Sequence, residues 1–193
     1  MTPEKALELL KAGNARFVAG KTTHRNLPAN VRATAAGQYP FGAIVSCMDS
    51  RVPVELLFDL TIGDAFSLRV AGNVINPDIL GSLEYAAKVA GAKLIVVLGH
   101  THCGAVKGAI DGVELGNLTS ILARIVPSGG APGSSKDHAY VDQVTEQNVR
   151  NAMKDIREKS PVLKELLATG AVHLVGGIYD VETGKATFFA GNE

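Results

Sequence analysis

Short apolar runs that alternate with helix-like segments constrain the fold of this chain of 193 residues most strongly. Four runs have the length of β-strands, at 41–47, 64–70, 93–99 and 171–179. Helical signals lie between them, at 54–60, 76–90, 104–110, 117–126, 140–159 and 160–170. The first and third runs are apolar on both faces, as strands inside a parallel sheet are. The alternation predicts right-handed crossovers and a parallel sheet.

The expected fold class is α/β, with flanking helices and a mostly parallel sheet in the order 2-1-3-4, numbered along the chain. A tight turn at 182–184 leads into 185–190, which we expect to form an antiparallel C-terminal edge strand. Thr2-Pro3-Glu4 carries the signals of a helix start, and Gly20 ends this first helix.

The length and the even composition predict one domain over 1–193, with 1–36 as an N-terminal helical arm. The apolar face of the first helix, which includes Leu10 and Phe17, packs either on the core or on another subunit. We expect the second arrangement. The stretch 127–137, rich in Ser, Gly and Pro, is interpreted as a surface loop and not as an active-site lid.

The charge balance bears on the possible partners. The chain has 19 Lys+Arg and 19 Asp+Glu, a formal net charge of zero, and no basic stripe, so we expect no nucleic-acid partner. Its apolar runs are far shorter than the roughly 18 residues of a membrane-spanning helix. Met1 also leads directly into a helix and not into a signal peptide. We therefore expect no membrane partner and a cytoplasmic protein.

Chemically reactive side chains follow two of the predicted strands. The motif Cys47-Met48-Asp49-Ser50-Arg51 comes directly after the first strand, and His100-Thr101-His102-Cys103 follows the third. In the order 2-1-3-4 the connections of the first and third strands leave in opposite directions, which opens a crevice at their carboxyl ends. We therefore expect the two motifs to share one site.

Cys47 and Cys103 are the only cysteines of the chain. They are metal ligands, a disulfide or redox pair, or inert buried thiols, and His100 beside Cys103 favours metal ligands. Thiolates with an imidazole select zinc, and three protein ligands leave one position open for water. His102 is a second, less favoured candidate ligand, because the two residues between His100 and Cys103 allow a turn that presents both to one ion. The remaining histidines stand alone in the sequence and are interpreted as surface or core residues.

Asp49 and Arg51 are the candidate catalytic residues. Asp49 can accept a hydrogen bond from water at the metal, and the planar fork of Arg51 can hold its carboxylate through two parallel bonds. Alternatively, the two residues form a local ion pair that only stabilises the turn before Pro53. Asp49 is also a possible fourth metal ligand in a closed state.

The two motifs, Cys47-x-Asp49-x-Arg51 and His100-x-x-Cys103, resemble those of the β-class carbonic anhydrases, and the resemblance covers nearly the whole chain. It implies a carbonate dehydratase, a zinc lyase that hydrates carbon dioxide reversibly to bicarbonate and a proton. Zn²⁺ would lie on Cys47, His100 and Cys103, beside the Asp49 and Arg51 pair. The resemblance further implies a homodimer in which the first helix embraces the partner, often doubled to a homotetramer.

Three more residues match the pocket of the plant-type branch of this family. The resemblance implies that Gln38 donates its amide to the substrate oxygen and that Phe66 and Tyr85 line the carbon dioxide site, in part across subunits. In the bicarbonate-inhibited branch a tryptophan, an arginine and a tyrosine hold a second bicarbonate. Arg69 and Tyr179 match two of these positions, but Ile44 replaces the tryptophan. We therefore expect the plant-type, open-site branch.

Two other functions are compatible with the same residues. The same fold and ligand set also resembles the carbon disulfide and carbonyl sulfide hydrolases. In those enzymes a long, restricted channel selects the substrate. A non-catalytic zinc-binding or bicarbonate-binding protein, with Asp49 closing the metal site, would carry the same residues.

Overall fold

One sheet of five strands organises the computed structural model, which describes residues 1–125 and 133–190. The strands lie in the order β2-β1-β3-β4-β5, where the first four are parallel and β5 pairs antiparallel with β4. Their bounds are β1 Gly42–Ser46, β2 Ala65–Arg69, β3 Leu94–His100, β4 His173–Tyr179 and β5 Ala186–Ala190. The predicted fold class and strand order are confirmed.

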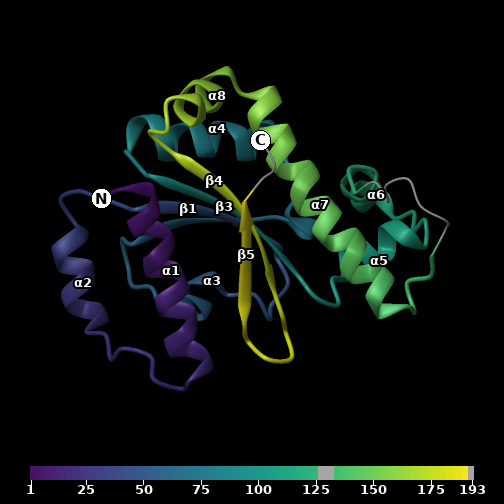
Figure 1. Ribbon diagram of the computed structural model, residues 1–193, viewed down its shortest axis with the longest axis horizontal. Helices are drawn as coiled ribbons and strands as arrows, with labels where there is room; N and C mark the ends of the chain where they lie inside the picture. The colour runs from purple at the N-terminus through teal and green to yellow at the C-terminus, as the bar shows by residue number, and fades with distance from the viewer. Residues whose placement is uncertain (126–132, 191–193) are drawn as a thin grey trace.

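Helices connect the strands and cover both faces of the sheet (Figure 1). Their bounds are α1 Pro3–Val18, α2 Leu27–Thr34, α3 Val54–Leu57, α4 Pro77–Glu84, α5 Gly104–Ile110, α6 Gly116–Leu122, α7 His138–Lys159 and α8 Pro161–Ala168. A 3-10 turn, η1 (Ala71–Asn73), follows β2, and a π-helical turn, η2 (Tyr85–Val89), continues α4. The single helix predicted over 76–90 therefore changes its winding at Tyr85. Most of the loop predicted over 127–137 falls outside the described residues.

The side chains of the central strands alternate between two cores, as the period of a β-strand requires. Ala43 and Val45 of β1 pack with α7 and α8 on one face, whereas Ile44 packs on the other face with residues of α1 and α3. Every residue of β1 and β3 is buried, which explains why their sequences read as continuous apolar runs. Among the described helices, none is both long and apolar enough to cross a bilayer.

The first helix packs on the sheet of its own chain. Ala6 and Leu10 of α1 belong to the same core as Ile44 and Phe58. The expectation that this face packs on another subunit is therefore wrong for these residues. The physical reason is that the sheet needs a cover on this face, and the short α3 leaves room beside it.

Two residues of α1 set how closely it approaches α3 and the turn between β4 and β5. A Cβ atom at Gly13 would lie 1.9 Å from the carbonyl oxygen of Phe58, so only glycine permits this contact. Asn14 is buried, and its Nδ2 donates to the carbonyl oxygens of Leu57 at 3.1 Å and Gly184 at 2.9 Å. Its Oδ1 accepts from the amide of Ala186 at 2.8 Å. Asn14 thus joins α1 to α3 and to the turn between β4 and β5.

Candidate metal centre

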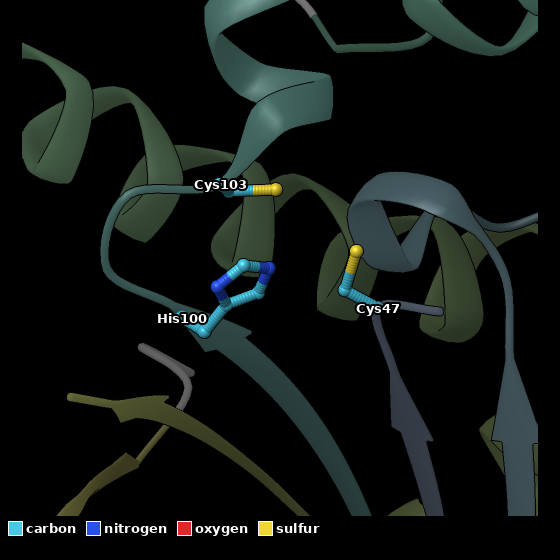
Figure 2. Close-up of side chains that lie close together, drawn as sticks. All are labelled: Cys47, His100 and Cys103. Atoms are coloured by element: carbon cyan, nitrogen blue, oxygen red, sulfur yellow. The ribbon is translucent and has the colours of Figure 1, made fainter. Parts of the chain in front are cut away.

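Three ligand-type side chains from two loops meet at the carboxyl ends of β1 and β3. Cys47 follows β1, His100 ends β3, and Cys103 immediately precedes α5. Because β1 and β3 pair in parallel, with Ser46 opposite Leu98, these positions reach the same edge of the sheet. Their ligand atoms all lie within 4.8 Å of one another, and the side chains face a common space (Figure 2). The cluster therefore lies where the strand order predicts a crevice.

The geometry around His100 prepares its Nε2 atom for a metal. The ring is fully buried, and Nδ1 lies 2.9 Å from the carbonyl oxygen of Thr101. Since a carbonyl oxygen only accepts, Nδ1 carries the proton and Nε2 presents its lone pair to the cluster. Nε2 is buried without a hydrogen-bond partner. A buried acceptor without a partner is costly, and a metal ion would satisfy it.

The two thiols are free, buried and unequal. The pKa of Cys47 is lowered, chiefly by its interaction with the Cys103 thiol and to a smaller extent by nearby backbone amides. One of these amides, Gly72 N, lies 3.3 Å from the Cys47 Sγ atom. The pKa of Cys103 is raised by its interaction with Cys47 and by burial. Of the two thiols, Cys47 therefore loses its proton more readily, and a cation that binds both sulfurs would also have to displace the proton of Cys103.

The donor set fits zinc. Two sulfurs and one imidazole nitrogen are ligands that zinc prefers, with bonds of about 2.0–2.3 Å. Three protein ligands also leave one coordination position, the pattern of catalytic zinc sites. Within 1–125 and 133–190, no second group of three His, Cys, Asp or Glu meets the same distance requirement. The predicted zinc site on Cys47, His100 and Cys103 is confirmed.

Asp49 and Arg51 form a two-pronged ion pair beside the cluster. Arg51 donates from Nε to Oδ1 at 3.0 Å and from Nη2 to Oδ2 at 2.7 Å, and its backbone amide donates to Oδ1 at 2.9 Å. These bonds, chiefly those from the Arg51 side chain, lower the pKa of Asp49 to about 2. Oδ2 lies 3.8 Å from His100 Nε2. An ionised carboxylate is therefore held at the edge of the metal site.

Two neighbours of the cluster have contacts that the sequence reasoning missed. Arg69 donates from Nη2 to the carbonyl oxygen of Asp49 at 2.6 Å and from Nε to that of Cys47 at 3.3 Å, so it holds the backbone of the first motif. Gly72 supplies the amide that faces the Cys47 sulfur. Arg69 ends β2 and Gly72 follows it, and β2 is the parallel neighbour of β1. Because the carboxyl ends of parallel strands meet at one edge, the predicted strand order already places both residues near Cys47.

His102 is not part of the metal cluster. Its Nε2 lies 3.2 Å from Glu182 Oε1, and its ring meets that of His138 edge to face, with centroids 4.6 Å apart. The structure therefore favours His100 over His102 as the ligand. It also shows that His138 does not stand alone, because the start of α7 lies beside the second motif.

The three residues expected at the substrate pocket are only partly brought together within one chain. Phe66 and Tyr85 meet edge to face, with ring centroids 6.1 Å apart, and line a groove of about 680 Å³ on β2 and α4. Gln38 is exposed and does not line this groove, and neither does any of the zinc ligands. Ile44 and Tyr179, compared above with the bicarbonate-inhibited branch, are both buried in the core.

Comparisons with known proteins agree with this site. A family model described as carbonic anhydrase matches residues 42–186. Carbonic anhydrase 2 of Mycobacterium tuberculosis is 39% identical over an alignment of length 193, and the alignment covers 95% of this chain and 91% of that protein. The carbonic anhydrase of Mycolicibacterium smegmatis is 38% identical over an alignment of length 192, with the same coverage of 95% and 91%.

Solved structures share the fold. The β-carbonic anhydrase CafA of Aspergillus fumigatus superposes with a TM-score of 0.75 at 26% identity, covering 98% of this chain and 91% of that one. One of two tetrameric β-carbonic anhydrases from Sordaria macrospora superposes with a TM-score of 0.74 at 25% identity, covering 96% and 97%. Since the family model spans most of the chain and the zinc ligands fall inside it, this protein belongs to the β-class carbonic anhydrases and has carbonic anhydrase activity.

Proposed function

We propose that this carbonic anhydrase hydrates carbon dioxide with Asp49 and Arg51 as its catalytic pair. The observation that carries the proposal is the position of the Asp49 carboxylate, which lies 3.8 Å from the metal-binding nitrogen of His100 and is held by three hydrogen bonds from Arg51. Zinc on Cys47, His100 and Cys103 supplies Lewis-acid activation of a water molecule.

Asp49 and Arg51 divide the work on that water. The free lone pairs of the Asp49 carboxylate accept a hydrogen bond from the water and thereby orient it toward the carbon of carbon dioxide. Arg51 keeps the carboxylate ionised and restrains it from moving onto the metal, because two of its donors already occupy both oxygens. The proton released on hydration passes to buffer.

The substrate pocket is proposed to contain Gln38, Phe66 and Tyr85. A small apolar substrate needs an apolar wall and one polar anchor, which the two rings and the Gln38 amide can provide. Within one chain the Phe66 and Tyr85 groove is open, with Tyr85 49% exposed. We infer that a second copy of the chain covers this groove and completes the pocket. Replacing Phe66 or Tyr85 by alanine should then raise KM for carbon dioxide more than it lowers kcat.

The assembly is proposed to be a homodimer or a homotetramer, and the relative from Sordaria macrospora is described as tetrameric. Residues 1–193 form one domain in this proposal, and the arm 1–36 extends the interface with its exposed side chains. Leu27 and Val31 of α2 are 50% and 54% exposed, which suits a segment that a partner covers. Sedimentation of the purified protein tests the assembly.

Two observations favour the open-site branch, in which Asp49 does not bind the metal. Ile44 is 1% exposed and packs in an apolar core, so it offers nothing to a second bicarbonate, and Asp49 is held by Arg51. Bicarbonate should then inhibit only as a product, without cooperativity. A cytoplasmic location is proposed as well, because the site needs both thiols reduced. Cell fractionation tests this location.

The decisive experiment is Asp49→Asn, which keeps the size of the side chain and removes its charge. We expect full zinc content by elemental analysis and a fall in kcat/KM of about 100-fold or more in a stopped-flow dye assay, the scale of a lost proton-handling group. Asp111→Asn, at an exposed aspartate, is the matched control and should match the wild type. Unchanged turnover in Asp49→Asn would remove Asp49 from the mechanism.

A further inference from the structure

One of the two residues between His100 and Cys103 has an unusual backbone conformation. His102 has a φ angle of +57°, in the left-handed region that glycine enters freely and other residues enter at a cost. Histidine is among the residues that enter this region more often than most. At His102 the conformation reverses the chain between the end of β3 and the start of α5. The reversal brings the side chains of His100 and Cys103 to one point.

Side-chain contacts hold His102 in this conformation. Its Nε2 atom lies 3.2 Å from Oε1 of Glu182, in the turn between β4 and β5, and its ring packs against His138 at the start of α7. We call these two contacts the His102 latch. Glu182 is itself positioned, because its backbone amide donates to Asp180 Oδ1 at 2.9 Å.

The residue before His102 ties the same turn to the hairpin. Thr101 donates its amide to the carbonyl oxygen of Tyr179 at 2.9 Å and accepts from the amide of Val181 on Oγ1 at 3.1 Å. Two adjacent residues of the ligand loop are therefore anchored to the turn between β4 and β5.

The backbone of His102 also reaches the catalytic pair. Its carbonyl oxygen lies 3.4 Å from Nη2 of Arg51, and the same nitrogen donates to Asp49 Oδ2 at 2.7 Å. The left-handed conformation fixes the direction of this carbonyl. A change in the turn at His102 therefore alters both the ligand positions and the position of Arg51.

We propose that His102 is a positioning residue of the zinc site. Its latch to Glu182 and His138 holds the left-handed turn that pre-forms the second half of the ligand set and orients the guanidinium of Arg51. The effect on the ligand positions rests on the zinc site, and the effect on Arg51 rests on the proposed function of Asp49 and Arg51. The latch acts on the loop and not on the metal, because His102 is no ligand.

Zinc release from the loaded enzyme into an excess of chromophoric chelator tests the latch, since it requires no turnover of carbon dioxide. Glu182→Ala removes the acceptor from an exposed position and should raise the release rate about 3-fold, as the modest net value of one exposed hydrogen bond implies. Glu182→Gln retains an oxygen acceptor and should restore the wild-type rate. His102→Gly keeps the left-handed backbone but loses both contacts, and should raise the rate about 10-fold.

The matched control is Glu4→Ala. Glu4 faces His173 at 3.5 Å, a second His–Glu pair, at the opposite end of β4 from the zinc site. Its removal should leave zinc release unchanged. The proposal is overturned if Glu182→Ala releases zinc at the wild-type rate, or if Glu182→Gln fails to restore it. A failure of the proposed role of Asp49 would appear separately, in the hydration assay of Asp49→Asn.

Discussion

Single residues at the zinc site are prepared by their neighbours before any metal binds. The carbonyl oxygen of Thr101 sets the tautomer of His100, and the Cys103 thiol and the amide of Gly72 favour the Cys47 thiolate. Outer contacts of this kind orient ligands and reduce the rearrangement that binding requires. The tautomer of His100 and the lowered pKa of Cys47 therefore both favour metal binding.

Cys103→Ser tests the ligand set at this scale. A serine hydroxyl is a poor zinc ligand at neutral pH, so the variant should lose zinc on dialysis against chelator while the wild type retains about one per chain. Zinc should raise the melting temperature of metal-free wild type and leave that of the variant nearly unchanged, because ligand binding stabilises only a fold that holds the ligand. Full zinc occupancy in the variant would exclude Cys103 as a ligand.

Asp59 is a buried carboxylate that serves the fold and not the site. Burial raises its pKa, but hydrogen bonds from Arg16 and Thr23 outweigh this effect, so the pKa is lowered overall. Arg16 Nε lies 2.5 Å from Oδ2, and the amide of Thr23 lies 3.1 Å from Oδ1. Asp59 thus fastens the connector between α1 and α2 to the end of α3.

The contribution of Asp59 to stability should depend on pH in a defined direction. Because its folded-state pKa lies below the unfolded value of about 3.9, the contribution is present above that value and is lost as pH falls through the folded-state pKa. Asp59→Asn, which tolerates the positive φ of this position, should lower the free energy of unfolding at pH 7 by about 2 kcal/mol. Urea unfolding of metal-free protein between pH 6 and pH 3 measures the difference. A difference that stays constant over this range would contradict the assignment.

At the scale of elements, one polar residue joins segments that lie far apart in the sequence. Asn14 satisfies two carbonyl oxygens and one amide belonging to α3 and to the turn before β5. The turn before β5 also carries Glu182, whose side chain contacts His102. One turn therefore contacts both α1 and the loop that holds His100 and Cys103. Asn14, near the N-terminus, and Glu182, near the C-terminus, are therefore linked to the metal site through this turn, although neither is a metal ligand.

Asn14→Ala should lower the free energy of unfolding by about 3 kcal/mol, because three backbone groups lose a partner in a buried position. Urea denaturation measures this loss. The exposed Asn117→Ala should change the free energy by no more than about 0.5 kcal/mol. A loss in Asn14→Ala as small as that of the control would show that the backbone groups find water instead.

At the scale of the whole molecule, the β2 edge of the sheet exposes apolar side chains beside an open groove. Val89 and Tyr85 of η2 are 69% and 49% exposed beside the groove that Phe66 lines. A π-helical turn is often associated with functional sites, and here it presents these two side chains outward. An exposed apolar surface at a proposed substrate pocket is consistent with a second copy that covers it.

Val89→Glu should weaken this assembly, because a two-fold axis places equal charges of two copies in the same interface. We expect sedimentation to show smaller particles than in the wild type, with a matching loss of hydration activity. Leu115→Glu is the control, since Leu115 is 65% exposed, precedes α6 and does not line the groove of Phe66 and Tyr85. Equal effects of both variants on assembly would argue against an interface at η2.

Much of the fold followed from local signals. The N-cap of Thr2, Pro3 at the first helical turn and the doubly buried strands predicted the elements to within a few residues. The winding change at Tyr85 was missed, because it has no signal in the helical pattern of the sequence. The face covered by α1 was also misjudged, because an apolar stripe does not identify the surface that buries it.

What the sequence by itself determined is the chemistry: which residues can bind zinc, and that they follow strands whose carboxyl ends meet. This was possible because strand alternation and ligand type are local properties of the chain. Only the tertiary structure decided that His100, and not His102, faces the cluster, that Arg69 and Gly72 support it, and that His102 is anchored to Glu182. These contacts join segments up to 80 positions apart, and their partners are selected by packing in three dimensions.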